Sequence, residues 1–232
     1  MAGEKIRLVG LTGKIGVGES TFAEVLCEEF GGVEFAFAKP IKKVAEVLFP
    51  HKNLIEDDKN EKIILGGENL KLSFDPSERK GEDLISDLTY RKLFQILGAD
   101  TIREHIHRDY FIWQLSREVN EFLAKSEEKN PLIVVSDVRF DNEAKWIKDH
   151  GGFIIKIIQK GTALNETSLS EENDYHRKRK SLSYKSKQTG DEVHCSEYGI
   201  DLKYLDYLYV NDLMYPPKTP IYDYFQAIAW RI

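Results

Sequence analysis

The sequence predicts an α/β fold in which a parallel sheet is flanked by helices on both faces. Short apolar runs of the kind that form buried parallel strands recur along the chain, and segments with helical spacing separate them. A glycine-rich turn joins the first apolar run to the first helical segment. The chain has 232 residues, 41% of them apolar, which suffices for one such domain with an inserted lid. We therefore expect a single domain over residues 1–232.

The expected elements follow from the spacing of apolar residues and from helix-boundary residues. Strands are expected at residues 6–11, 33–37, 132–135, 153–158 and 207–210. Helices are expected at residues 22–27, 41–49, 90–105, 110–125, 142–150 and 221–230. Residues 50–88 are polar and acidic, and we expect a loop-rich excursion with one short helix there. A second long polar stretch covers residues 159–196.

Residues 10–21 contain the pattern of a phosphate-binding loop, or P-loop, with one departure. Gly13, Gly18 and Ser20 match G-x-x-x-x-G-K-[ST], but Glu19 occupies the lysine position. A strand before the loop and a helix after it would aim backbone N–H groups and the positive helix end at one point, which suits a polyphosphate. The glycines alone are also compatible with a simple tight turn. The complete strand–loop–helix context, with Ser20 and Thr21 at the magnesium position, favours a phosphate site.

Because Glu19 replaces the P-loop lysine, the motif does not define which cation would bind the phosphates. Lys14 follows the first loop glycine and either reaches the phosphates or is a solvated surface lysine. A carboxylate at position 19 repels phosphate, so we expect Glu19 to oppose ATP binding and Glu19→Lys to strengthen it.

Asp137 and Arg139 follow the apolar run at 132–135, at the sheet edge where ligands bind in such folds. Asp137 is a candidate magnesium ligand together with Ser20, and Arg139 is a candidate phosphate ligand. The alternative is a structural salt bridge between Asp137 and Arg139, with Asp137 also capping the next helix.

Three polar side chains in the helical segment 90–105 are candidates for binding a second ligand. Arg91 and Gln95 lie four residues apart and share a helix face, and Arg103 adds a second cation. A guanidinium and an amide can bind a phosphate and a base edge together, although a solvated helix face is the simpler explanation of these residues taken alone. Trp113 either stacks on a base or belongs to the core.

Residues 176–187 are strongly basic, with six Lys or Arg among twelve residues and no acid. Three interpretations remain open: a lid that closes over phosphates, a solvated loop, and a nuclear-localisation or nucleic-acid-binding segment. Ser196 and Glu197 indicate either a helix start or substrate contacts, and the preceding His194-Cys195 pair lacks a second pair at metal-ligand spacing.

Bulk composition narrows the class of protein. The net charge of −6 gives no case for nucleic-acid binding, and two cysteines do not make a disulfide framework. No apolar run reaches membrane-spanning length and the N-terminus has no signal-peptide pattern, so we expect a cytoplasmic protein without a membrane partner.

Together these segments resemble the deoxynucleoside monophosphate kinases of bacteriophages and large DNA viruses, over residues 6 to 212. Besides the P-loop, the resemblance rests on residues 37–42 (FAKPIK), 91–103 (RKLFQILGADTIR), Trp113, 137–143 (DVRFDNE), and 194–197 (HCSE) before 209–211 (YVN).

The resemblance implies transfer of the γ-phosphoryl group of ATP to a (deoxy)nucleoside monophosphate with Mg²⁺, in the host cytoplasm if the chain is viral. By position, the ATP-binding residues would be Gly13, Lys14, Gly16, Gly18, Glu19, Ser20 and Thr21. The acceptor would be bound, within about residues 40–127 and beyond, by Lys42, Arg91, Gln95, Arg103, Trp113, Ser196 and Glu197. The transfer would involve Lys14, Asp137, Arg139 and, from a lid over about 160–196, Arg177 and Arg179.

Two other functions remain open at this stage. An animal-type phosphomevalonate kinase shares the Val-Ser-Asp strand end and the Ser-Glu segment. A non-catalytic nucleotide-binding protein would explain Glu19. In each case the partners are small molecules, and a homodimer stays open.

Overall fold

The computed structural model describes residues 7–14, 16–49, 62–65, 84–160, 183–185, 192–197, 199–212 and 218–229. The chain forms two compact units, one made of Met1–Lys39 with His107–Ile232 and the other of Pro40–Ile106.

The first unit is built on a five-stranded sheet with the order β2-β5-β1-β6-β9. Its strands are β1 (Arg7–Gly13), β2 (Gly32–Phe35), β5 (Leu132–Val135), β6 (Phe153–Gln159) and β9 (Tyr207–Asn211). All neighbouring strands run parallel, and Val9 of the central strand β1 pairs with Val134 of β5 and Phe153 of β6. This sheet confirms the predicted α/β fold class.

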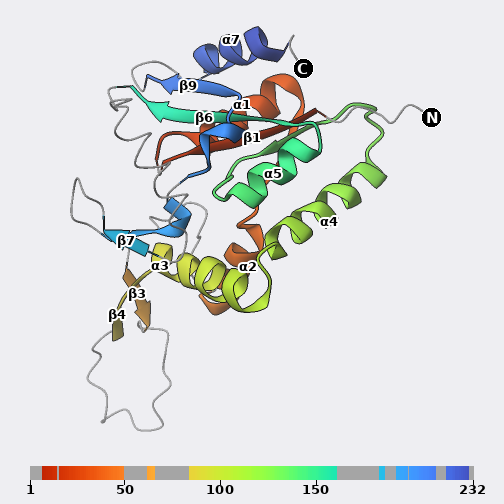
Figure 1. Cartoon of the computed structure of the whole chain (residues 1–232). Helices are drawn as coiled ribbons and strands as arrows, with labels where there is room; N and C mark the ends of the chain where they lie inside the picture. Colours follow the sequence, from red (N-terminus) through yellow and green to blue (C-terminus); the bar gives the residue numbers. More distant parts are fainter. Residues whose placement is uncertain are drawn as a thin grey trace. The chain divides into compact units, whose positions relative to one another are not determined.

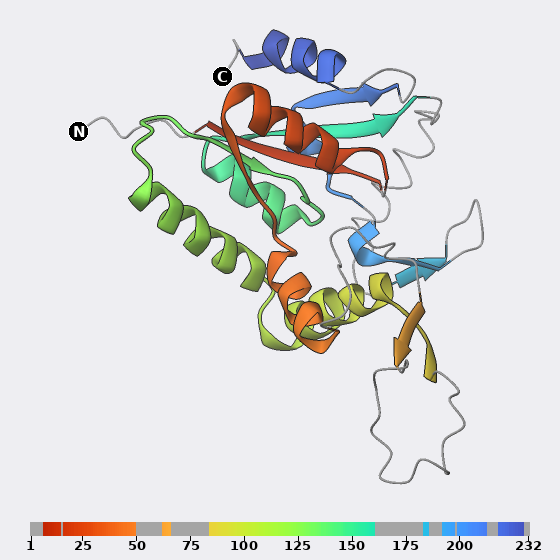
Figure 2. The ribbon, with the colours of Figure 1, turned by 180° about the vertical axis from the view of Figure 1, so that it is seen from behind.

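Helices cover both faces of this sheet. They are α1 (Glu19–Phe30), α4 (Tyr110–Lys125), α5 (Asp141–Asp149) and α7 (Lys218–Ala229). Figures 1 and 2 show α1 on one face of the sheet and α5 on the other. The unit also contains a short antiparallel pair, β7 (Ser183–Lys185) with β8 (Glu192–His194), and the 3₁₀ turns η2 (Cys195–Glu197) and η3 (Leu202–Tyr204).

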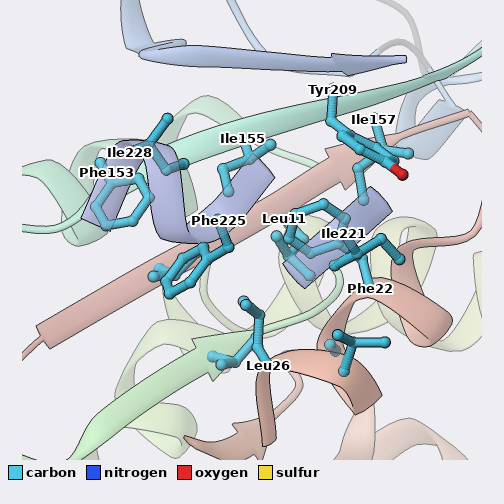
Figure 3. Close-up of a cluster of buried hydrophobic side chains, with 14 of the residues drawn as sticks. Leu11, Phe22, Leu26, Phe153, Ile155, Ile157, Tyr209, Ile221, Phe225 and Ile228 are labelled. Carbon is cyan, nitrogen blue, oxygen red and sulfur yellow. The ribbon is translucent and has the colours of Figure 1, made fainter. Parts of the chain in front are cut away.

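The largest core cluster lies between the sheet and the helices α1 and α7 (Figure 3). Alternate strand residues such as Leu11, Ile155 and Tyr209 point to this face, because successive side chains of a strand alternate between faces. Phe22 of α1 and Phe225 of α7 complete the cluster. Burial on both faces of the central strands explains why they are continuous apolar runs in the sequence.

The second unit contains most of α2 (Lys39–Leu48), the antiparallel strands β3 (Lys62–Leu65) and β4 (Leu84–Thr89), α3 (Tyr90–Gln95) and the π-helix η1 (Ile96–Ile106). Ala45 of α2 and Tyr90 of α3 form its buried centre. Gly98 of η1 lies against Ile41, because a Cβ at position 98 would be 2.6 Å from the Ile41 Cδ1 atom. The prediction of one short helix and otherwise loops at 50–88 is therefore wrong at both β3 and β4, whose apolar runs are too short to reveal the pairing.

The strands β7 and β8 also lie where no strand was expected, in the polar stretch 159–196. The strands of the five-stranded sheet and the helices agree with the expected bounds to within three residues. Both α4 and β5 have the predicted bounds, whereas β2 ends at Phe35 instead of residue 37. Beyond Phe35 the backbone N–H groups of Phe37 and Ala38 bind the Asp137 carboxylate, so the chain leaves the sheet. In the described part of the chain, no helix is long and apolar enough to span a membrane.

Candidate active site

Four segments meet at the carboxyl edge of the sheet in the first unit. The P-loop follows β1, residues 36–38 follow β2, residues 136–140 follow β5, and Asn211 ends β9. Because all the strands are parallel, their carboxyl ends lie at one edge, as Figure 1 shows for the arrowheads of β6 and β9. Hydrogen bonds from the side chains of Arg139, Asp137 and Asn211 connect these four segments.

The P-loop joins Gly13, the last residue of β1, to Glu19, the first residue of α1. Gly18 precedes the helix with φ 102° and ψ 26°, a left-handed conformation that favours glycine. Gly13 is confined differently, since a Cβ there would lie 2.7 Å from the Ile157 carbonyl oxygen. Both motif glycines are therefore required by the geometry of the loop.

Glu19 is buried, and its carboxylate is paired with the Arg139 guanidinium. The Arg139 Nη2 atom donates to Glu19 Oε1 at 3.0 Å, and the Nη1 atom donates to the Gly13 carbonyl oxygen. Arg139 therefore contacts the first residue of the loop and the lysine position together. It is a sequence-predicted site residue that the structure brings to the P-loop.

Asp137 binds backbone, not Arg139. Its Oδ1 atom accepts the Phe37 N–H at 2.7 Å and its Oδ2 atom accepts the Ala38 N–H at 2.9 Å. The alternative of an Asp137–Arg139 salt bridge is therefore wrong, and so is the expectation that Asp137 caps the next helix. Asp137 instead attaches the end of β5 to the segment between β2 and α2.

The residue that caps α5 is Glu143, to which sequence reasoning assigned no role. Its buried Oε2 atom accepts the backbone N–H of Arg139 at 2.8 Å and that of Phe140 at 3.0 Å. An acid at the third helical position is a signal that could have identified it. These bonds fix the backbone from which the Arg139 side chain extends.

Asn211 is a second residue whose role sequence reasoning missed. Its side chain is buried at the end of β9, and its Nδ2 atom donates to the Val17 carbonyl oxygen at 2.8 Å. The same Nδ2 atom would lie 2.7 Å from a Cβ at Gly18. A polar residue that directly follows an apolar strand run was the available signal, and Asn211 braces the loop from the far edge strand.

The remaining loop residues differ in exposure. Lys14, Gly16 and Ser20 are exposed, whereas Thr21 is half-buried. Magnesium in phosphate-transfer sites is held by one or two protein ligands together with phosphates and water, so exposed Ser20 and the partly accessible Asp137 fit such an ion. Within the described ranges no group of three or more His, Cys, Asp or Glu forms a metal cluster.

The candidate acceptor residues are divided between the two units. Lys42 lies in α2, Arg91 and Gln95 are four residues apart in α3, and Arg103 lies in η1; all four are half-buried in the second unit. That these four residues bind an acceptor stays a prediction.

Trp113 belongs to α4 of the first unit, and it is 58% exposed. The Arg117 guanidinium lies 5.5 Å from the centre of its ring. The alternative that Trp113 belongs to the core is therefore wrong, because it lies on the outer side of a helix whose buried side is formed by Phe111, Leu115 and Val119.

The segment expected to form a lid falls mainly outside the described residues. Arg177 and Arg179 belong to that undescribed part. Ser196 and Glu197 lie in η2, where the Ser196 Oγ atom is 2.9 Å from Nδ1 of the buried His194 ring.

Comparison with known proteins identifies the family. The model of the deoxynucleotide monophosphate kinase family matches residues 51–193. A protein of Acanthamoeba polyphaga mimivirus, which carries the provisional name deoxynucleotide monophosphate kinase, is 33% identical over 171 residues, covering 71% of this chain and 80% of that protein.

Solved structures with some similarity include two kinases. Dephospho-CoA kinase from Campylobacter jejuni is 17% identical with a TM-score of 0.44, over 97% of this chain and 98% of that one. Shikimate kinase from Aquifex aeolicus is 13% identical with a TM-score of 0.39, over 97% of each chain. The family match and the viral relative lead to one conclusion: the chain belongs to the deoxynucleotide monophosphate kinase family.

Proposed function

We propose that this protein transfers the γ-phosphoryl group of ATP to a (deoxy)nucleoside monophosphate, which yields the corresponding diphosphate. The observation that carries the proposal is the P-loop between β1 and α1 with the Arg139 guanidinium seated in it, in a chain of this family. Phosphoryl transfer requires little covalent chemistry from the protein, so positioning and charge neutralisation are the roles to assign.

The donor side of the reaction is assigned to the first unit. Backbone N–H groups at the start of α1 face the loop and suit the β- and γ-phosphates of ATP. Arg139 supplies positive charge and directional donors to the phosphate that is transferred. A magnesium ion bound near Ser20 and Asp137, mainly through the phosphates and water, would neutralise the charge that develops during transfer.

The acceptor side is assigned to Arg91, Gln95 and Arg103, with Lys42, Trp113, Ser196 and Glu197 as further candidates. A guanidinium binds the acceptor phosphate bidentately, and the Gln95 amide can read a base edge through paired donor and acceptor atoms. Arg177 and Arg179 would close over the phosphates.

The test is a coupled assay of ADP formation from Mg-ATP with a panel of deoxynucleoside and ribonucleoside monophosphates. Phosphomevalonate is included as the acceptor of the alternative kinase. Turnover of at least one monophosphate is expected. If phosphomevalonate is the only acceptor that is phosphorylated, the protein is a phosphomevalonate kinase and not a nucleoside monophosphate kinase. If ATP binds but no acceptor is phosphorylated, the protein is a non-catalytic nucleotide-binding protein, an alternative that Glu19 in the P-loop favours.

Arg91 provides the sharpest test of the acceptor side. Arg91→Gln removes a charged hydrogen-bond donor, which contributes about 1.5–3 kcal/mol, so the KM of the acceptor should rise roughly tenfold or more while the KM of ATP stays the same. Lys92→Gln is the control, because Lys92 is the exposed neighbour of Arg91 on the same helix. Equal acceptor KM values for the two variants would remove Arg91 from the site.

A further inference from the structure

The P-loop glutamate does not extend toward solvent from the loop. Glu19 is 7% exposed, and its Oε1 atom would lie 3.3 Å from a Cβ placed on Gly13. The carboxylate is therefore folded back over the loop, against the last residue of β1. A buried carboxylate is unfavourable unless a cation or hydrogen-bond donors compensate the loss of hydration.

Arg139 provides that compensation from another part of the chain. Its guanidinium donates through Nη2 to Glu19 and through Nη1 to the Gly13 carbonyl oxygen. These partners are the first residue of the P-loop pattern and the residue at its lysine position. The positive charge of Arg139 is thus held within the same loop in which the lysine charge would otherwise be found.

We propose that Arg139 supplies the P-loop cation in place of the missing lysine, and that Glu19 is a positioning residue that holds the guanidinium over the loop. This inference rests on the proposed function for the identity of its ligand, the ATP phosphates. A guanidinium has five N–H donors, and the contacts above use one on each terminal nitrogen. Donors therefore remain for phosphate oxygens, and a quarter of the Arg139 side chain is exposed to receive them.

The pairing changes the expectation for Glu19. A bare carboxylate would oppose an incoming polyphosphate, but the Arg139 guanidinium 3.0 Å away neutralises this one. The cation and the glutamate act as one unit. In Glu19→Lys/Arg139→Gln the lysine becomes the cation of the loop, as in the usual P-loop pattern, and no acid opposes it.

The primary experiment measures Mg-ATP affinity by calorimetry, without any acceptor. Arg139→Gln should weaken binding at least tenfold, because it removes the loop cation. The double variant Glu19→Lys/Arg139→Gln returns a cation to the loop and should bind Mg-ATP at least as tightly as the wild type. Arg108→Gln is the matched control, since Arg108 is exposed and outside the loop.

Three outcomes of this experiment overturn the inference: unchanged affinity of Arg139→Gln, failure of the double variant to recover binding, and no ATP binding by the wild type. Melting curves check that each variant is folded. If Arg139→Gln does not fold, Glu19→Gln/Arg139→Gln replaces it, because that variant leaves no buried charge unpaired. Binding is measured without acceptor, so a wild type that binds ATP but phosphorylates no monophosphate contradicts the proposed function alone.

The positioning role of Glu19 has its own readout. In Glu19→Gln the guanidinium loses its charged partner while the loop loses an anion, so kcat should fall at least tenfold without an increase in the KM of ATP. Glu24→Gln, an exposed position on the same helix, should leave both values unchanged. A rise in kcat with a fall in KM would identify Glu19 as an inhibitory charge, and no change in either would exclude a positioning role.

Discussion

Single side chains hold this site together by binding the backbone of segments far away in the sequence. Asp137 binds the amides of Phe37 and Ala38, at separations of 100 and 99 residues. Asn211 binds the carbonyl of Val17 across 194 residues. A side chain that satisfies a buried backbone group contributes more through the cost of leaving that group unsatisfied than through its own bond strength. Residues of this kind should therefore be sensitive to isosteric substitutions.

Asp137→Asn tests this expectation with almost no change in shape. One carboxylate oxygen becomes an NH₂ donor that faces a backbone N–H, so one amide loses its acceptor. The free energy of unfolding should fall by about 1–3 kcal/mol, the usual cost of an unsatisfied buried group. Urea unfolding measures the change.

Asp149→Asn serves as the control for this substitution. Asp149 lies at the end of α5, where its half-exposed carboxylate pairs with Lys145. The loss of such a surface pair should change the free energy of unfolding by less than about 0.5–1 kcal/mol. Similar losses for the two variants would mean that the two amide bonds of Asp137 contribute little.

At the scale of elements, the two ends of α1 are both glycines with positive φ, but they have different surroundings. Gly18 precedes the helix at φ 102°, and a Cβ there would lie 2.7 Å from the Asn211 Nδ2 atom. Gly31 follows the helix at φ 68°, with no atom within 4 Å of such a Cβ. Gly18 is therefore needed both for its left-handed backbone conformation and for its close contact with Asn211. Gly31 is needed only for its left-handed backbone conformation.

Alanine substitutions should separate these two effects. Gly31→Ala should cost about 1–2 kcal/mol of unfolding free energy, the price of a left-handed alanine. Gly18→Ala should cost clearly more and should also weaken ATP binding, because the new methyl group displaces Asn211 from the loop.

The double variant Gly18→Ala/Asn211→Ala gives the decisive comparison. Removing the Asn211 side chain takes away the clash, so the combined loss of stability should be smaller than the sum of the single losses. Thermal unfolding of the wild type, Gly18→Ala, Asn211→Ala and the double variant measures this coupling. Additive losses, or equal losses for Gly18→Ala and Gly31→Ala, would show that the contact with Asn211 does not add to the loss of stability in Gly18→Ala.

On the scale of the whole molecule, the C-terminal helix α7 closes the aromatic core of the first unit. Tyr224 of α7 packs edge-on against Tyr209 with ring centres 5.0 Å apart, and its hydroxyl donates to the Leu208 carbonyl oxygen at 2.9 Å. Burial, assisted by the neighbouring Tyr207 and Tyr209, raises the pKa of Tyr224 to about 12. The packing of the last helix is thus linked to the protonation of one phenol.

The stability of the protein should consequently fall at alkaline pH. In the unfolded chain a tyrosine loses its proton near pH 10, while folded Tyr224 retains it to about pH 12. The folded state then holds more protons than the unfolded state, so the free energy of unfolding decreases as pH rises from 10 to 12.

Urea unfolding at pH 8 and pH 11 measures this dependence. Tyr224→Phe should lose less stability between the two pH values than the wild type, although it is less stable at pH 8 because the bond to Leu208 is absent. Tyr222→Phe, on the same helix, should retain the wild-type loss. An identical loss for wild type and Tyr224→Phe would exclude Tyr224 as a source of the alkaline effect.

The sequence by itself determined the order of the main strands and helices, the position of the P-loop and the family. These features are local, because each apolar run, helical spacing or glycine pattern is contained in a short segment of the chain. Each can therefore be recognised without knowing the rest of the fold. The central elements β5 and α4 were accordingly predicted with the correct bounds. The short strands β3 and β4 were missed, because a pair of short runs far apart in the sequence gives no local signal.

The tertiary structure alone decided which charged groups are partners. The sequence left a salt bridge between Asp137 and Arg139, two residues apart, open as an alternative to ligand binding. In the fold, Asp137 binds the amides beyond β2, and Arg139 crosses to Glu19 in the P-loop. Parallel strands bring their carboxyl ends to one edge, so residues distant in the chain become neighbours while adjacent residues diverge. Pairing at such an edge depends on strand order, which is set by the packing of the whole sheet.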